Sequence, residues 1–255
     1  MTERSRIAAH RGGALEQPEN TIAAFHHAVA IGADEVELDI HCSSDGVLVV
    51  HHDATLERMT TGHGAVGAHD LAALQRFRIR GSEGAWIPTL EEALAVIAPS
   101  PVTLRLEVKR AADGSPYPRM IERAIDLVAS HGLENRFYVT AFHADDLAVA
   151  ADITRAETGL FLIEDQTLRA IGFGGLSRVL DLAGTRNVAL PVDAIGAETL
   201  DEGRRRGISI SAFGCHSAAQ IEKALRLALH VFTSDRPSLA LELRREAETS
   251  GSEGH

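Results

Sequence analysis

Carboxylates alternate with apolar residues in two segments whose composition is typical of β-strands. In residues 36–40, Glu37 and Asp39 lie on one face of an extended chain, because successive side chains of a strand point to opposite sides. In residues 104–109, Glu107 alternates with leucine and valine in the same way. The three carboxylates form a set of hard oxygen ligands, which suits Mg2+ or Ca2+ better than Zn2+ or a thiol-binding metal. The spacing therefore predicts a site for a divalent cation.

Two histidines stand where predicted strands end, a position from which they could transfer protons. His10 closes the segment Ile7–His10, and His52 closes Val47–His52. Histidine is the side chain best suited to accept and donate protons near neutral pH. Arg11, next to His10, carries a fixed fork of donors that matches a phosphate group. The pattern indicates acid–base chemistry beside a phosphate-binding group.

A purely structural explanation exists for each of these features. A strand with one charged face could lie at the edge of a sheet, where water solvates that face, although two such strands in a parallel α/β chain weaken this explanation. Most of the 13 histidines are expected to be surface or hydrogen-bonded residues. Only their place at a strand end distinguishes His10 and His52. Cys42 and Cys215 are far apart in the sequence and are expected to be small packing residues of a reduced protein.

Short β-branched or apolar runs alternate with helix-like segments along the chain. Strands are predicted at Ile7–His10, Glu35–Ile40, Val47–His52, Val102–Lys109, Phe137–Phe142, Gly159–Ile163, Val188–Val192, Ile208–Ala212 and Val231–Ser234. Helices are predicted at Ile22–Ile31, Leu90–Ile97, Pro118–His131, Ala144–Asp152, Leu176–Leu182, Ala197–Arg206, Ala218–Leu229 and Arg236–Glu246. This alternation, with no break in composition, predicts one α/β domain built on a parallel sheet.

The number of units favours a closed barrel. About eight strand–helix units in this length fit a (β/α)8 TIM barrel better than an open doubly wound sheet, which stays as the alternative because periodicity does not show closure. Residues 53–85 fit the alternation poorly and are predicted to form a small insertion between the second and third barrel units. The barrel domain is expected to span residues 1–245, and the polar residues 246–255 are expected to form a flexible tail.

The barrel would bring the chemical groups together. Both faces of a parallel strand are covered, so the apolar side packs against the outer helices and the charged side points inward. Unpaired buried carboxylates are costly and need a cation or a counter-charge. Active sites of such barrels gather at the carboxyl ends of the strands. We therefore expect the three carboxylates and the two histidines to converge at a single rim.

Composition excludes several classes of function. The chain has 255 residues, of which 36 are acidic and 25 basic, giving a net charge of −11. This acidic balance argues against duplex nucleic acid or an anionic membrane as the main partner. No apolar run approaches the roughly 18 residues that a membrane span requires. The first residues lack the apolar core of a secretory signal. We expect a cytoplasmic protein that is a monomer or a small homo-oligomer.

A series of motifs runs in fixed order through the first 110 residues. The motifs are His10–Gly12, Pro18–Thr21, Ala24–Phe25, Gly32–Asp39, Ser44–Asp53, Leu56–Gly62, Ile87–Glu92 and Leu106–Lys109. In order and spacing they resemble the glycerophosphodiester phosphodiesterases. Near the end of the chain, Thr233–Pro237 resembles the last strand-to-helix turn of that family.

The resemblance implies a (β/α)8 barrel and a metal-dependent hydrolase of glycerol and lipid metabolism. The expected substrate is a small-molecule glycerophosphodiester, cleaved to glycerol 3-phosphate and an alcohol such as choline or ethanolamine. The resemblance assigns roles to nine residues: metal binding to Glu37, Asp39 and Glu107, general acid and base to His10 and His52, phosphate binding to Arg11 and Lys109, and completion of the site to Glu19 and Asn20.

The second half of the chain departs from the family pattern. The family usually has a Trp-Thr-Val-Asn-like stretch on the seventh strand, whereas this chain has residues 208–215, in which Phe213 could partly replace the tryptophan beside the substrate. A related phosphodiesterase acting on lysophospholipids or other glycerol-like diesters is therefore an alternative. A non-enzymatic barrel that binds a phosphorylated ligand is a further one. The residues leave open which histidine is the acid, and whether water or a substrate hydroxyl attacks first.

Overall fold

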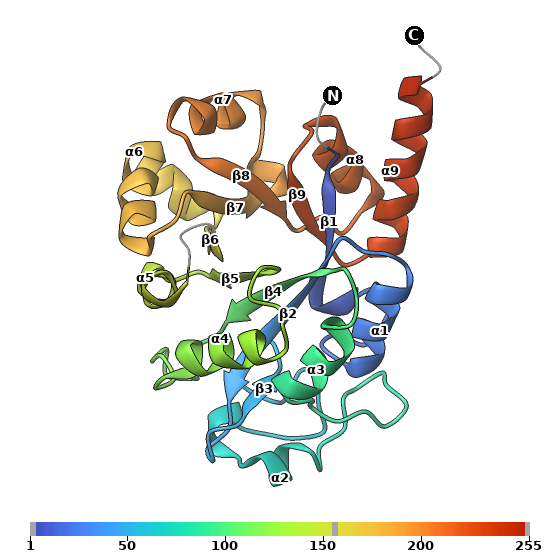
Figure 1. The fold of residues 1–255 in the computed structure, drawn as a ribbon, viewed down its shortest axis with the longest axis vertical. Helices are drawn as coiled ribbons and strands as arrows, with labels where there is room; N and C mark the ends of the chain where they lie inside the picture. Colours follow the sequence, from blue (N-terminus) through green and yellow to red (C-terminus); the bar gives the residue numbers. More distant parts are fainter. Residues whose placement is uncertain (1–3, 155–157, 253–255) are drawn as a thin grey trace.

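A ring of eight parallel strands forms the centre of the molecule (Figure 1). The structure is a computed structural model and describes residues 4–154 and 158–252. The strands of the ring are β1 (Arg6–Ala9), β2 (Glu35–Cys42), β4 (Thr103–Val108), β5 (Phe137–Ala141), β6 (Gly159–Leu162), β7 (Asn187–Pro191), β8 (Ser209–Phe213) and β9 (Val231–Ser234). Each pairs in parallel with its neighbour, and β1 pairs with both β9 and β2. These last pairings close the ring, so the predicted TIM barrel is confirmed and the open sheet is wrong.

Helices lie outside the ring and follow most of the strands (Figure 1). They are α1 (Ile22–Ala30), α2 (Leu71–Leu74), α3 (Leu90–Ile97), α4 (Met120–Ser130), α5 (Ala144–Ile153), α6 (Asp165–Ala183), α7 (Ala197–Arg205), α8 (Ala218–Arg226) and α9 (Pro237–Ser252). The outward, apolar side chains of the strands pack with the helices into one large buried cluster. The alternation in β2 therefore works as expected: Val36, Leu38 and Ile40 are buried in that cluster, and the acidic side chains between them face the interior of the barrel.

One predicted strand has a different role. The sequence predicts a strand at Val47–His52, and the structure has a short strand there, β3 (Leu48–Val50), that runs antiparallel to β2 outside the ring. Ser43 explains the reversal, because its hydroxyl and backbone bond Val47 across a turn that Gly46 completes at φ +85°. His52 thus follows a hairpin strand, and the expectation that it ends a barrel strand is wrong.

The segment between β3 and α3 forms the insertion beside the ring. It holds α2 and a small apolar cluster in which Leu56, Val66, Leu74 and Ile87 pack with Val49 of β3. At its end, Thr89 and Glu92 form a capping box that starts α3, in agreement with the helix predicted at Leu90–Ile97. The insertion thus has enough buried apolar surface to hold its side chains in place against the barrel.

The last helix is longer than predicted. The sequence predicts that the helix ends at Glu246 and that a flexible tail, 246–255, follows, whereas α9 continues to Ser252. No proline interrupts this stretch, and the first glycine is Gly251, so the helix has no strong reason to stop earlier. Residues 253–255 of the predicted tail lie outside the described residues. The boundary of the barrel domain at residue 245 stays a prediction.

Candidate active site

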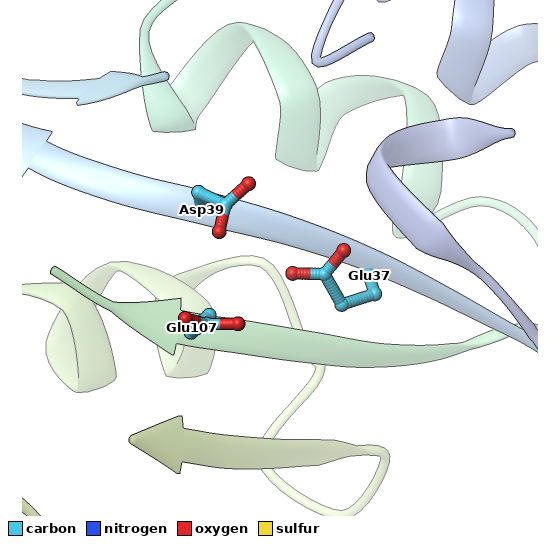
Figure 2. A group of neighbouring side chains, drawn as sticks. All are labelled: Glu37, Asp39 and Glu107. Atoms are coloured by element: carbon cyan, nitrogen blue, oxygen red, sulfur yellow. The ribbon is translucent and has the colours of Figure 1, made fainter. Parts of the chain in front are cut away.

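Three buried carboxylates meet inside the barrel on two neighbouring strands. Glu37 and Asp39 project from β2 and Glu107 projects from β4, as Figure 2 shows. The strand register places Asp39 directly opposite Glu107. One oxygen from each carboxylate lies within 4.8 Å of the others. The two-residue period of the strands therefore produces the convergence that the sequence predicts, on adjacent strands of the ring.

The carboxylates carry more negative charge than their surroundings neutralise. Lys109 Nζ lies 3.0 Å from Asp39 Oδ1 and also bonds Glu107. Burial opposes ionisation of Asp39, but the charges of Lys109 and Arg11 hold its pKa well below the usual range. Burial and the charge of Asp39 raise the pKa of Glu37 to about 8, and burial also raises that of Glu107. A further cation beside these three carboxylates would therefore favour the ionised form of Glu37 and Glu107.

Two oxygens of this group have no hydrogen bond among the described residues. They are Glu37 Oε1 and Asp39 Oδ1, both buried. Asp39 Oδ1 has the nearby lysine as an ion pair, but the geometry is not that of a hydrogen bond. Buried acceptors are nearly always satisfied in folded proteins, so unpaired oxygens in a buried carboxylate cluster fit a set of ligands for a hard divalent cation.

His10 follows β1, and each of its ring nitrogens faces a carboxylate. Its Nδ1 is 2.5 Å from Asp235 Oδ1, and its Nε2 is 3.9 Å from Glu37 Oε2. Burial disfavours the charged imidazole, but the hydrogen bond to Asp235 and the charge of Glu37 outweigh it and raise the pKa of His10. Nδ1 therefore donates to Asp235, and Nε2 faces the carboxylates.

Arg11 is held beside the same carboxylates in an uncommon backbone conformation. Its φ is 52°, in the left-handed region, and Gly12 follows at φ +80°. A Cβ at Gly12 would lie 2.7 Å from Ala24 Cβ, so only glycine fits this turn. The turn aims the Arg11 amide at Glu37 Oε2, at 2.8 Å, and its guanidinium at Glu19 Oε1, at 3.0 Å. The strain places a cation next to the acidic cluster.

His52 is oriented by a neighbouring carboxylate and an arginine of the insertion. Its Nδ1 lies 2.6 Å from Asp53 Oδ1. Arg58 donates to both Asp53 oxygens, at 2.5 and 3.0 Å, and to both Glu19 oxygens, at 3.0 and 2.7 Å. Burial, the largest effect, lowers the pKa of His52. Asn20 has a positioning contact as well, since its amide donates to Asp39 Oδ2 at 2.8 Å.

A pocket of about 220 Å³ opens beside these groups, and both charged and apolar side chains line it. The apolar lining residues are Phe142, Leu162, Ala189 and Phe213. Phe142 and Phe213 contact each other edge to face, with ring centroids 6.2 Å apart. The pocket can thus hold a polar, charged group against the acidic and basic side chains while an apolar or extended part of the ligand lies over the aromatic rings.

The ten residues predicted for the site fall into two groups. Seven line the pocket: His10, Arg11, Glu37, His52, Glu107, Lys109 and Phe213. Three lie behind this lining and contact residues in it: Glu19, Asn20 and Asp39. Their roles in binding or catalysis stay predictions at this point.

Sequence reasoning missed further residues that the structure places in or against the pocket, besides Phe142, Leu162 and Ala189. Five with polar side chains are Asp53, Arg58, Thr140, His216 and Asp235. Three of them stand inside motifs quoted above, which was the available signal for Asp53, Arg58 and Asp235. Thr140 and His216 lie outside those motifs, and their place in the site depends on the fold.

The cysteines take the structural role that the sequence predicts. Cys42 and Cys215 are both buried and free. Burial raises the pKa of Cys215 to about 12, so its thiol stays protonated.

No helix within residues 4–154 or 158–252 has the length and apolar character needed to cross a bilayer.

Comparison with known proteins decides the family. Residues 10–239 match the sequence model of the glycerophosphoryl diester phosphodiesterase family. The chain belongs to this family. The enzyme class predicted from the motifs, a glycerophosphodiester phosphodiesterase, is thereby confirmed.

Individual relatives cover the chain to different extents. A glycerophosphodiester phosphodiesterase of Bacillus altitudinis is 31% identical over 95% of this chain and 99% of its own length. That of Caldanaerobacter subterraneus is 36% identical, but the match spans 54% of this chain and 58% of the relative. The crystal structure of a glycerophosphoryl diester phosphodiesterase-like protein from Agrobacterium tumefaciens superposes with a TM-score of 0.93 at 32% identity, over 96% of this chain and 99% of that one. This chain thus has the fold of the family over nearly its whole length.

Proposed function

We propose that the chain hydrolyses glycerophosphodiesters to glycerol 3-phosphate and an alcohol, with a divalent cation bound by Glu37, Asp39 and Glu107. The observation that carries the proposal is the convergence of these buried, incompletely neutralised carboxylates with two imidazoles at one pocket. Mg2+ or Ca2+ suits the all-oxygen set. When bound, the cation supplies positive charge that polarises a phosphoryl oxygen and stabilises charge developing on it.

Arg11 and Lys109 bind the phosphate group in this proposal. Both line the pocket, and both are held by carboxylates, so neither side chain is free to swing away. Their charges reduce the repulsion between the phosphodiester anion and an incoming nucleophile. Lys109 stays protonated because, although burial disfavours its charge, Asp39 and Glu107 raise its pKa further above the ordinary value.

His10 and His52 act as the acid–base pair. In each ring Nδ1 is engaged by a carboxylate, which leaves Nε2 free to exchange a proton in the pocket. One imidazole takes the proton from the attacking oxygen, and the other gives a proton to the departing alkoxide. The attacking oxygen belongs either to water or to the substrate hydroxyl next to the phosphate, and in the second case water then opens a cyclic phosphate.

A coupled assay for glycerol 3-phosphate tests this function. Purified protein is incubated with glycerophosphocholine, glycerophosphoethanolamine and glycerophosphoinositol, each with and without added Mg2+ or Ca2+. Release of glycerol 3-phosphate that needs the metal is the expected result. Binding of these diesters without turnover would overturn the proposal in favour of a barrel that only senses a phosphorylated ligand.

The apolar residues that line the pocket favour one second candidate, a phosphodiesterase acting on lysophospholipids. Phe142 and Phe213 could lie against the acyl chain or glycerol carbons of such a substrate, and Phe142 is 40% exposed. The same assay, extended to lysophosphatidylcholine with detection of released choline, distinguishes the two. The cytoplasmic location and a monomeric or small homo-oligomeric state stay predictions.

A further inference from the structure

The carboxylate of Asp235 lies between two imidazoles. Asp235 Oδ1 is 2.5 Å from His10 Nδ1, and Asp235 Oδ2 is 2.5 Å from His216 Nδ1. The two rings are 6.3 Å apart and tilted by 44°. His10 comes from the start of the barrel and the other two residues from its last two units, so the arrangement joins the beginning and the end of the chain at the pocket.

The backbone around His216 is fixed, so its contact with Asp235 is built into the fold. Gly214 turns the chain after β8 at φ +79°. The next residue, Cys215, is fully buried, donates its amide to Thr233 O and accepts a hydrogen bond from Ser234 Oγ. Ser217 then caps α8. His216 is therefore held between two anchored residues, directly beside the turn that carries Asp235.

Both Nδ1 atoms donate to the carboxylate, which occupies both of its oxygens. Burial alone would raise the pKa of Asp235, but the hydrogen bonds from His10 and His216 lower it, so the side chain remains an acceptor. An ionised acceptor at Nδ1 selects the tautomer of His10 that leaves Nε2 facing the pocket and Glu37. Without the second hydrogen bond, the carboxylate could rotate away from His10.

The other imidazole has an equivalent arrangement. His52 donates through Nδ1 to Asp53, and Arg58 holds Asp53 with two hydrogen bonds. Each imidazole thus contacts a carboxylate that a second basic group also binds: Arg58 of the same insertion for Asp53, and His216 after β8 for Asp235. The repetition at two positions indicates that the second group matters for orientation.

We propose that Asp235 is a positioning residue for His10 and that His216 positions Asp235. Asp235 sets the tautomer and ring orientation of His10, and His216 keeps the carboxylate in contact with it. The inference rests on the proposed acid–base role of His10. His216 also lines the pocket, so direct contact with substrate is the competing explanation, and it predicts a different kinetic effect.

Three variants test the proposal. Asp235→Asn keeps the shape but lets an amide NH2 face Nδ1, so kcat should fall by about 10²- to 10⁴-fold with little change in KM. His216→Ala removes one hydrogen bond that acts through Asp235, so kcat should fall by roughly tenfold at constant KM. His216→Asn should recover most of this loss, because Asn Nδ2 stands where Nδ1 of histidine stands. His26→Ala, at an exposed position on α1, is the control.

A spectroscopic readout separates this proposal from the proposed function. ¹⁵N NMR of histidine-labelled protein without substrate reports which ring nitrogen of His10 carries the proton. Asp235→Asn should shift His10 from the Nδ1–H tautomer toward Nε2–H, whether or not glycerophosphodiesters are substrates. An unchanged tautomer in Asp235→Asn overturns the role of Asp235. A raised KM at constant kcat in His216→Ala, or wild-type values of both, overturns the role of His216.

Discussion

The barrel interior contains two layers of buried charged side chains. In one layer arginines neutralise the carboxylate, and in the other the carboxylates outnumber the neighbouring cations. We call Glu35, Arg6 and Arg105 the lower layer. Glu35 bonds Arg105 and lies 3.3 Å from Arg6, so its charge is matched by arginines. We call Glu37, Asp39, Glu107 and Lys109 the upper layer. Here three carboxylates share one lysine, with Arg11 at the side, and burial with repulsion raises the pKa of Glu37 to about 8.

Under the proposed function, this difference separates buried charges that serve stability from buried carboxylates that a bound cation would neutralise. Glu35, Glu37 and Asp39 stand on one face of one strand, and all are 3% exposed or less. Residue type and burial are therefore the same, and only the neighbouring cations differ. An unmatched charge is costly in a protein interior, so its presence in the upper layer is expected only if a bound group offsets the cost.

Removal of divalent cations should have the largest effect, and it should act through the upper layer alone. After EDTA treatment and desalting, turnover of a glycerophosphodiester should fall on the order of 10⁴-fold, and added Mg2+ or Ca2+ should restore it. The measurement is the initial rate of glycerol 3-phosphate release. Turnover that survives thorough chelation would contradict the assignment of Glu37, Asp39 and Glu107 as ligands.

Loss of either imidazole should come next in size. His10→Ala and His52→Ala should each lower kcat by about 10²- to 10⁴-fold, as expected for removal of a general acid or base. Neither histidine contacts the lower layer, so the melting temperature should stay close to that of the parent. Steady-state kinetics and thermal unfolding check both parts. Near-full activity in both variants would end the acid–base assignment.

The same substitution at two levels of β2 should change stability in opposite directions. Glu35→Gln leaves Arg105 without its ion pair in a buried position and should destabilise the protein by about 3–5 kcal/mol. Burial and Asp39 oppose ionisation of Glu37, so folding at neutral pH has to protonate this carboxyl; Glu37→Gln removes that cost and should stabilise the chelated protein by about 1–3 kcal/mol at neutral pH. Urea unfolding with EDTA present measures both. Equal signs for the two variants would remove the distinction between the layers.

Much of this arrangement could be predicted from local patterns. The alternation in residues 36–40 and 104–109 predicts which side chains face the interior, and the parallel register of β2 and β4 brings them together. The direction of β3 could not be predicted, because a strand pattern looks the same in either direction and the Ser43–Gly46 turn decides it. The end of α9 could not be predicted either, since the residue types at 246–250 are compatible with both helix and coil.

Sequence patterns do not predict which partner neutralises each buried charge. Glu35 and Glu37 are two residues apart and are both acidic, yet the first meets Arg105 and Arg6 and the second meets Asp39. The partner of His10 is 225 residues away, at Asp235. The pairs of Glu35 depend on which strands become neighbours of β2, and the His10–Asp235 contact depends on the closure of the ring between β1 and β9, so no spacing within either segment encodes them.

The smallest change in stability should come from substitution of Asp34, the residue before Glu35, and this change should depend on pH. Asp34 accepts from the Ile7 amide and from Arg244 and Arg4, and although burial opposes ionisation, these contacts lower its pKa. A lowered folded-state pKa means that its stabilisation is present above about pH 4, the value of the unfolded chain, and is lost as the pH falls further.

Asp34→Asn keeps an acceptor for the Ile7 amide but loses both arginine pairs. The variant should therefore lose about 1 kcal/mol at pH 7, because the site is partly open to solvent, and less at pH 3. Urea unfolding at the two pH values, with Asp126→Asn at an exposed position of α4 as control, measures the difference. A penalty that is the same at both pH values would mean that Asp34 stabilises by shape alone. The ion pairs of Asp34 with Arg4 and Arg244 would then add nothing to stability, and the contrast with the upper layer would lie in packing and not in the neutralisation of charge.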